Sequence, residues 1–324
     1  MNIGQLYEEI RSYKKSRTIT TALHFGVLSA IGNSDISFDE LCCKLAVADK
    51  WLQMIFNVLI SVGIIEESRG RYSLTNFGIE VDQSLALRSF ANYHYYCFDS
   101  WQKLPERLVS GESGNFHFHI RADKDFCHAY LMSMDQISVS NMPFIEKECE
   151  GYLNGSVFDV GAGPASFCRH LANQNSKMNV TAIDYPEIVA RARELFMSPD
   201  NFEWVGVDFL DWTPLHTANT VFCSHLLEYC SKNMRLLWLS KLNSFLKKKG
   251  YLILVLFLRE SISQDNTDLD LFEMSTGLNG TQLGYLQTSE EIQKILTDSG
   301  FKIIKLKPIP RGPSYPEFLI VCQL

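Results

Sequence analysis

From residue 155 onward the chain alternates short apolar or β-branched runs with longer stretches of helical periodicity. The runs expected to be strands are 157–160, 180–184, 220–223 and 251–258. The stretches expected to be helices are 164–174, 186–197, 231–248 and 288–299. Such alternation is typical of βαβ units, because parallel strands need a crossover connection. The pattern therefore predicts an α/β fold in which residues 151–324 form a Rossmann-like, doubly wound, mostly parallel sheet.

The first expected strand ends in Asp159 and leads into a turn that contains Gly161 and Gly163. Glycine lets the backbone come close to a ligand, and Pro164 suits the first turn of a helix, where its missing N–H costs nothing. The carboxyl end of a strand in such a sheet is the usual place for a ligand. A dinucleotide-binding loop would have glycine at the position of Ser166, and the carboxylate of Asp159 would repel a pyrophosphate. The turn therefore suits a cationic ligand.

Two further acids follow at the ends of the next apolar runs. Asp184 comes 21 residues after Gly163, where an acid can accept hydrogen bonds from both hydroxyls of a ribose. Asp208 follows the run 204–207 and can accept from an adenine amino group, while Phe209 packs on the ring. Acids at three successive strand ends describe a site for a cationic adenosine without phosphates. S-adenosylmethionine is such a molecule, and we expect it to be the cofactor.

The first part of the chain has the pattern of a different domain. Apolar residues recur at helical spacing from residue 4 to about 35 and from 50 to 62, and Ser37 is placed to cap the helix between them. Residues 64–75 predict a β-hairpin that turns at Gly70. Helices followed by a hairpin are the plan of a winged helix.

A winged helix suggests DNA binding, which the charges do not favour. Residues 38–80 carry four cations against six acids, a net charge of 4 − 6 = −2, and the whole chain carries −7. DNA binding depends on cations that neutralise phosphates, so we expect no nucleic-acid partner. We expect residues 1–100 to be a winged-helix-like dimerisation domain and residues 101–150 a helical connector that lines the substrate pocket.

Apolar runs, cysteines and histidines bear on location and metal binding. The longest apolar run, 252–258, has seven residues, against the roughly 20 that span a bilayer, and the first residues are too polar for a secretory signal. The nine cysteines show no CxxC spacing and predict reduced, buried thiols, so we expect a cytoplasmic protein without a membrane partner. His117 and His119 would share one face of a strand, but no third ligand is evident nearby, and we expect no metal.

Several fragments, taken in order, resemble the class I S-adenosylmethionine-dependent methyltransferases. The resemblance is strongest to the dimeric small-molecule O-methyltransferases of plants and of bacterial secondary metabolism, and it extends over nearly the whole chain. The fragments are 21–28, 38–41, 62–65, 72–75, Trp101-x-x-Leu104 with Gly111, Tyr130-x-x-Ser133-Met134-x-x-x-Ser138, 184–189 and 288–291.

The resemblance implies a homodimer built through the N-terminal domain and a defined set of site residues. The cofactor contacts that it implies are Asp159, Gly161, Gly163, Asp184, Asp208 and Phe209, to which we add Tyr185 and Ser224 as candidates. The candidate substrate contacts are Tyr130, Met134, which resembles the family's pocket methionine, and Glu273, which competes with Asp270 for the place of a later acidic residue.

The chain departs from the family at the catalytic base. Most members have His-Asp-Trp-x-Asp after the fourth strand, and here the position of that histidine is taken by Glu228. An ordinary glutamate, with a pKa near 4.3, is a weaker base than an imidazole near 6.5 by about two units, or roughly 3 kcal/mol. Glu228 could be a base if burial raises its proton affinity, could orient an amine or stabilise a cation, or could be a solvated acid at a helix start. His225 lies three residues earlier and is either a second candidate for catalysis or a packed side chain.

Three hypotheses for function follow. The first is methyl transfer from S-adenosylmethionine to oxygen, nitrogen or carbon of a small, aromatic or amphipathic metabolite. The second keeps the cofactor but uses it for ring closure, hydroxylation or other sulfonium chemistry. The third is a winged-helix scaffold without catalysis, which the intact set of cofactor acids disfavours.

Overall fold

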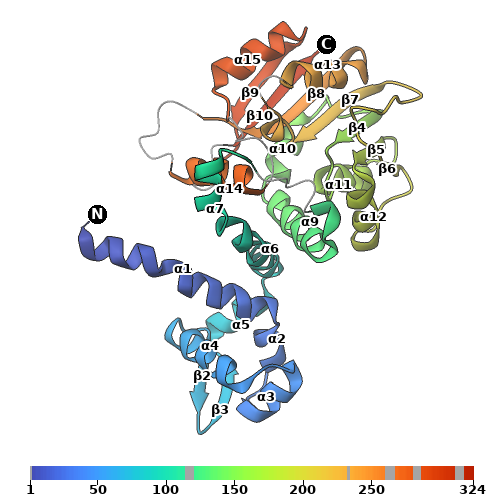
Figure 1. The fold of residues 1–324 in the computed structure, drawn as a ribbon. Coiled ribbons are helices and arrows are strands. Elements are labelled where there is room, and N and C mark those ends of the chain that lie inside the picture. Colours follow the sequence, from blue (N-terminus) through green and yellow to red (C-terminus); the bar gives the residue numbers. More distant parts are fainter. Residues whose placement is uncertain (1, 114–119, 232–233, 260–266, 280–285, 311–316) are drawn as a thin grey trace. The chain divides into compact units, whose positions relative to one another are not determined.

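The computed structural model describes residues 2–113, 120–231, 234–259, 267–279, 286–310 and 317–324. The chain divides into two compact parts, the N-terminal unit (Met1–Asp99) and the C-terminal unit (Ser100–Leu324). Figure 1 shows the helices and strands of both and labels most of them by the names used below. Within the described ranges, no helix combines the length and the apolar character that crossing a membrane requires.

The N-terminal unit is mainly helical and carries a small antiparallel sheet. Its helices are α1 (Ile3–His24), α2 (Val27–Ile31), α3 (Phe38–Leu45), α4 (Asp49–Ser61), α5 (Asn76–Gln83) and most of α6 (Leu85–Trp101). Its sheet has the order β1-β3-β2, with β1 at Ile36–Ser37, β2 at Ile65–Ser68 and β3 at Arg71–Leu74. The predicted hairpin is confirmed, because β2 pairs with β3 and Gly70 adopts a φ of +76° in the turn between them.

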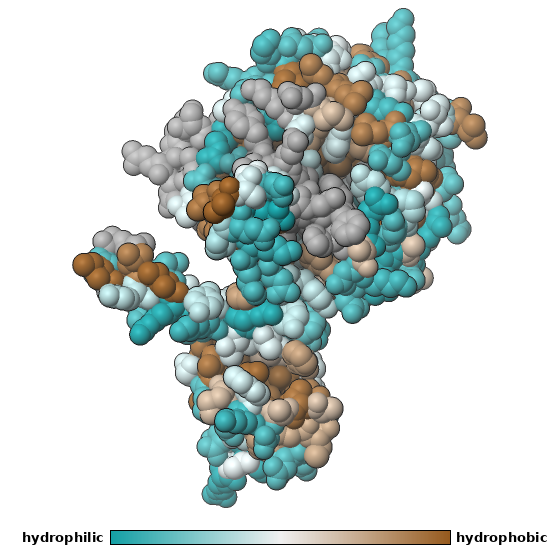
Figure 2. Space-filling model, viewed as in Figure 1, coloured by the Kyte–Doolittle hydropathy of each residue, from teal (hydrophilic) through white to brown (hydrophobic). Residues whose placement is uncertain are grey.

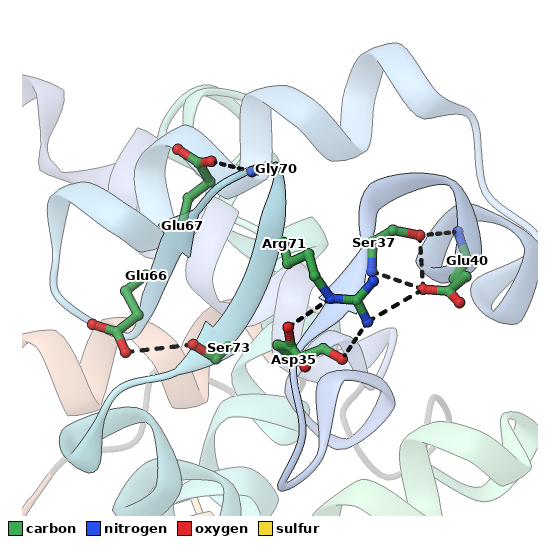
Figure 3. A network of polar contacts seen from close by, with 8 residues as sticks. All are labelled: Asp35, Ser37, Glu40, Glu66, Glu67, Gly70, Arg71 and Ser73. Atoms are coloured by element: carbon green, nitrogen blue, oxygen red, sulfur yellow. Dashed lines mark hydrogen bonds and ion pairs between the residues drawn. The ribbon is translucent and has the colours of Figure 1, made fainter.

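Polar contacts join the hairpin to the start of α3, as Figure 3 shows. Ser37 caps α3 and forms a capping box with Glu40: the Ser37 N–H donates to Glu40 Oε2 at 2.9 Å, and the Glu40 N–H donates to Ser37 Oγ. Arg71 on β3 donates from Nε to Asp35 Oδ2 at 2.6 Å. Apolar residues of the helices and the hairpin form the core of the unit, among them Leu28, Leu41, Leu52, Phe56, Leu59 and Tyr72.

The C-terminal unit is built on a seven-stranded sheet of order β6-β5-β4-β7-β8-β10-β9. Its strands are β4 (Ser156–Val160), β5 (Asn179–Asp184), β6 (Phe202–Gly206), β7 (Ala218–Ser224), β8 (Leu246–Phe257), β9 (Lys302–Pro308) and β10 (Glu317–Gln323). The strands from β4 to β8 run parallel, whereas β10 is antiparallel to both of its neighbours. The predicted fold class, a mostly parallel doubly wound sheet, is therefore confirmed.

Helices and one short 3-10 turn connect these strands. They are α7 (Leu104–Ser110), α9 (Lys124–Val139), α10 (Met142–Cys149), α11 (Ser166–Gln174), α12 (Pro186–Leu195), the turn η1 (Leu227–Tyr229), α13 (Arg235–Ser244), α14 (Thr267–Asn279) and α15 (Ser289–Asp298). The prediction of a helix over 231–248 is wrong at its C-terminal end, because α13 ends at Ser244. Residues from Leu246 onward belong to β8, because Leu246 pairs with Ala218 and the lysines that follow continue the strand.

The order of the strands places one edge of the sheet at the functional site. The chain runs from β4 outward to β5 and β6 and then returns to the other side of β4 as β7, so the order reverses between β4 and β7. Ligands of open α/β sheets bind outside the carboxyl ends of the strands at such a reversal. Because β10 is antiparallel, its first residue, Glu317, pairs with Phe257 at the end of β8 and lies at the same edge.

Candidate active site

The glycine turn after β4 combines a buried acid with a backbone that leaves room for a ligand. Asp159 is buried, and burial raises its pKa to about 7, although a hydrogen bond from the Cys168 thiol opposes this shift. Gly161 and Gly163 have φ values of +69° and +50°, in the left-handed region that favours glycine. A Cβ on Gly161 would lie 2.7 Å from Leu226 Cδ1, whereas one on Gly163 would meet no atom within 4 Å. The turn is therefore packed at Gly161 and open at Gly163.

Asp184 at the end of β5 is oriented by the same turn. Its Oδ2 accepts from the Gly163 N–H at 2.7 Å, and its Oδ1 accepts from the Tyr185 N–H at 2.7 Å. Burial raises the pKa of Asp184 to about 6, against the effect of these two hydrogen bonds. The predicted residues Gly163, Asp184 and Tyr185 therefore lie together.

Asp208 and Phe209 follow β6, the next strand along the sheet. Asp208 lies close enough to raise the pKa of Asp184 and, through its Oδ1, accepts from the Leu210 N–H at 3.0 Å. Phe209 is buried and contacts the Trp238 ring edge to face, with the ring centroids 5.1 Å apart. The structure thus places Asp208 near Asp184 and holds Phe209 within the core of the unit.

A polar link from α9 to the glycine turn was not anticipated from the sequence. Asp135 Oδ1 accepts from Ser166 Oγ and from Arg169 Nη2, both at 2.6 Å. Arg169 in turn donates from Nε to the carbonyl oxygen of Pro164 at 2.8 Å. Since Pro164 directly follows Gly163, this link fixes the turn to α9.

Glu228 belongs to a buried cluster at the ends of β7, β8 and β10. Its Oε1 accepts from the Phe257 N–H at 2.8 Å and lies 2.9 Å from His225 Nδ1. His225 Nε2 lies 2.8 Å from Glu317 Oε1, and Glu317 Oε2 accepts from the side-chain amide of Asn141. Glu228, Glu317 and Asn141 are all buried. We call Glu228, His225, Glu317 and Asn141 the polar cluster.

The electrostatics of the polar cluster favour a charged His225. Burial opposes the charge, but the carboxylates of Glu228 and Glu317 outweigh it and raise the pKa of His225 to about 10. The imidazole is therefore protonated at neutral pH and donates from both nitrogens. The interpretation of Glu228 as a solvated acid is not supported, because only 5% of the residue is exposed.

The candidate substrate residues lie on two helices, α9 and α14. Tyr130 and Met134 are on α9, and burial raises the pKa of Tyr130 well above its ordinary value, with Tyr229 and Asp184 adding to the shift. Glu273 on α14 accepts from Arg259 Nη2 through Oε2 and from the Leu286 N–H through Oε1, both at 2.6 Å. Its two oxygens therefore link α14 to Arg259, which follows β8, and to Leu286, which precedes α15.

The remaining candidates are Ser224 and the two histidines considered for a metal. Ser224 is the last residue of β7 and is partly buried, directly before the polar cluster. His117 and His119 lie outside the described residues. Among the residues that are described, no group of three or more histidine, cysteine or acidic side chains is arranged to hold a metal ion.

Sequence reasoning did not find Glu317, Asn141, Asp135 or Arg169. Glu317 carried a usable signal, since an acid at the start of the apolar run 318–322 resembles Asp159 within its own apolar strand. Asn141, Asp135 and Arg169 carry none, because the side-chain contacts that place Asn141 and Asp135 in the site, and the ion pair of Arg169 with Asp135, join residues 31 or more positions apart along the chain.

Comparisons with known proteins agree with this geometry. A family profile described as a methyltransferase domain matches residues 92–306, more than half of the chain. The trans-resveratrol di-O-methyltransferase of Vitis vinifera is 22% identical over 339 residues, which cover 94% of this chain and 92% of that protein.

Two solved structures show the same fold. An O-methyltransferase family protein from Burkholderia thailandensis has a TM-score of 0.82 at 15% identity and covers 100% of this chain and 98% of its own. Human N-acetylserotonin methyltransferase in complex with S-adenosylmethionine has a TM-score of 0.80 at 15% identity, with coverage of 99% and 98%. The chain belongs to the methyltransferase domain family.

The cofactor of the chain is S-adenosylmethionine, and the residues present fit it. The open position at Gly163 leaves space for a ligand directly beside the oriented carboxylate of Asp184. Asp159, Asp184 and Asp208 supply negative charge for a cationic molecule whose hydroxyl and amino groups donate hydrogen bonds.

Proposed function

We propose that the protein transfers a methyl group from S-adenosylmethionine to a small-molecule acceptor. The observation that carries this proposal is the juxtaposition of Asp184, Gly163 and Asp159 at adjacent strand ends, next to the polar cluster beyond β7. When bound, the cofactor supplies a methyl group on a positively charged sulfur. Asp184 and Asp208 are proposed to hold its adenosine part, and Tyr185, Phe209 and Ser224 to border it.

The contribution of the protein to the transfer is proposed to be positioning and electrostatics. Glu228 stands at the position that the catalytic base occupies in the family that the chain resembles. The Phe257 N–H and His225 fix one of its oxygens. Tyr130 and Met134 on α9 are proposed to contact the acceptor, while Glu273 holds the segment around Leu286. Holding two reactants in line is a large part of such catalysis.

The functional protein is proposed to be a homodimer formed through the N-terminal unit. Ile3, Leu6, Ile10 and Tyr13 follow one another at helical spacing along one side of α1, and each is between 47% and 76% exposed. Figure 2 shows hydrophobic residues gathered on this helix, near the N-terminus. An exposed apolar stripe of this kind favours burial against a second helix. We take that helix to belong to a second copy of the chain.

We also propose that the protein works in a reducing compartment such as the cytoplasm. Seven of its nine cysteines are buried as free thiols, a use of cysteine that suits such a compartment.

Calorimetric titration with S-adenosylmethionine and S-adenosylhomocysteine tests the function. Methyl transfer predicts saturable binding of both, since the adenosine contacts are shared. Asp184→Ala is expected to weaken both at least about tenfold, because a charged acceptor of two hydroxyls is lost. Exclusive binding of the sulfonium form would favour other sulfonium chemistry, and no binding of either would contradict the proposal.

A further inference from the structure

The polar cluster carries more negative than positive charge. It contains two carboxylates, Glu228 and Glu317, and one imidazole, His225, which sits within 2.9 Å of both. With His225 protonated, the formal charges of these three side chains add up to −1. A buried carboxylate is stabilised when a positive group comes next to it.

One oxygen of the polar cluster also lacks a hydrogen bond. Glu228 Oε1 is engaged by the Phe257 N–H and His225, whereas Oε2 is buried and has no hydrogen-bond partner among the residues that the structure describes. Leaving a buried acceptor unpaired costs about 1–3 kcal/mol, and more when it is charged. Glu228 therefore has both the charge and the acceptor capacity to take a donor that a ligand brings.

The backbone is strained to keep His225 in this place. Its φ of +49° is left-handed, which costs a non-glycine residue roughly 1–2 kcal/mol. The ring is held by Glu228, by Glu317 and by the Phe257 ring, whose centroid lies 4.4 Å away. Backbone strain that the surrounding contacts maintain is a pointer to function.

Resting on the methyl transfer proposed above, we propose that the acceptor atom is an amine nitrogen and that the polar cluster stabilises the positive charge this nitrogen gains. The lone pair of a neutral amine forms the new nitrogen–carbon bond, and the carbon–sulfur bond breaks with its electron pair on sulfur. The nitrogen then carries the positive charge. Its proton passes to Glu228 Oε2, which brings the three charged groups of the cluster to neutrality.

A hydroxyl acceptor would use this site less well. A phenol must lose its proton to become a good nucleophile, and its methylated product is neutral, so the buried carboxylate of Glu228 would have no positive charge to stabilise. A neutral amine needs no base before it attacks, and positive charge develops at the atom that faces the carboxylate. Charge placed in advance where charge develops is the most effective form of electrostatic catalysis.

Binding to the complex of the protein with S-adenosylhomocysteine tests the inference without turnover. The probes are phenyltrimethylammonium, which mimics a methylated cationic nitrogen, and its neutral carbon isostere tert-butylbenzene, both followed by ligand-observed NMR. We expect the cation to bind at least about tenfold more tightly than the isostere, as for a hydrogen-bonded or charge-paired group. Glu228→Gln and Glu317→Gln should each reduce this preference, while Asp298→Asn, which removes a charge from an exposed helix end, should keep it.

A product assay complements the binding assay. Aniline and phenol, and 1-naphthylamine and 1-naphthol, are offered as ring-matched pairs, and methylated products are identified by mass spectrometry. Methylation of the amine in preference to its phenol supports the inference. Equal binding of cation and isostere, or preferred methylation of the phenols, overturns it. If the unmodified protein does not bind S-adenosylhomocysteine at all, the proposed function is overturned instead. Failure of the amine inference and failure of the proposed methyl transfer are therefore distinguishable.

Discussion

Asp159 and Asp184 are buried carboxyl groups with pKa values of about 7 and about 6. Their ionised forms are the ones that suit a cationic cofactor. Because these values lie near neutrality, protons compete with the cofactor in an accessible pH range. In a solvent-exposed pair of acids, with pKa values near 4, the same competition would appear only in strong acid.

We expect the affinity for S-adenosylmethionine to fall as the pH is lowered from 8 to 5. Below its pKa of about 6, Asp184 is protonated, so affinity should drop roughly tenfold per pH unit once most of the group is neutral. Calorimetry across this range gives the profile, and Asp184→Asn should make it less steep below pH 6, leaving the dependence due to Asp159 around pH 7. A dissociation constant that stays the same from pH 8 to pH 5 in the unmodified protein would contradict this expectation.

The two glycines of the turn should respond differently to substitution by alanine. Gly163→Ala adds a methyl group in open space, so it should cost roughly 1–2 kcal/mol of stability from its left-handed φ and should weaken cofactor binding. Gly161→Ala has the same cost from its left-handed φ and in addition places a Cβ 2.7 Å from Leu226 Cδ1. Urea unfolding should rank Gly161→Ala as the less stable variant, and the reverse order would show that the turn is packed differently.

His225 should remain protonated throughout the physiological range. Its pKa is raised above the unfolded value of about 6.5, to about 10, so its contribution to stability is full below pH 6.5 and is lost as the pH rises through 10. NMR of 13C-labelled imidazole should show no titration of His225 between pH 6 and 9, with His225→Gln identifying its signal. Glu317→Gln removes one of the two carboxylates and should bring the titration down into this window.

At the scale of elements, α9 is held to the glycine turn by Asp135. The Arg169 side chain is largely buried, with 15% exposed, and Asp135 is the charged partner the structure gives it. Asp135→Ala should therefore lower the free energy of unfolding by about 1–3 kcal/mol and weaken cofactor binding through the turn. Lys294→Ala, in the exposed pair with Asp298 on α15, is the control and should cost less than about 0.5 kcal/mol. Equal effects in urea unfolding would show that the link does not fix the turn.

Prediction from sequence worked for elements whose signals are local. Gly70 marks the turn of the hairpin, and Ser37 and Glu40 form the capping box expected of them. It failed at residue 246, where Leu246 pairs with Ala218 of β7 and a lysine run with helical character continues as part of β8. The strands β9 and β10 were also not expected: they pair with each other, but they join the sheet only through β8, whose residues lie 60 or more positions before their partners in β10.

The candidate site divides in the same way. Asp159, Asp184 and Asp208 end strands that carry visible apolar patterns, so their meeting at one edge follows from the topology of parallel strands. The polar cluster could not be derived, since Glu317 reaches His225 over 92 residues by way of an antiparallel strand. Local spacing contains no information on such a contact.

For the whole molecule, the exposed stripe on α1 gives a test of assembly. We expect the protein to sediment at twice the chain mass of 37.0 kDa. Replacing Leu6 and Ile10 by aspartate should convert it to the single chain, because two charges cannot be buried in an apolar contact. Ser12→Asp, on the opposite side of the same helix, is the matched control and should leave the mass unchanged. A double variant that keeps the mass of the unmodified protein would place the dimer contact elsewhere.

The place of β10 between β8 and β9 has a consequence for folding kinetics. The sheet is not complete when β8 has paired with β7, because the neighbour on the other side of β8 is β10, which follows β9 in the chain. Until β10 docks, β8 presents an apolar strand with open backbone groups, the kind of edge that recruits other chains. Glu317 arrives with β10, so the polar cluster is complete only after this long-range pairing. Chains that have acquired the full cluster have therefore already passed the slow and aggregation-prone stage of folding.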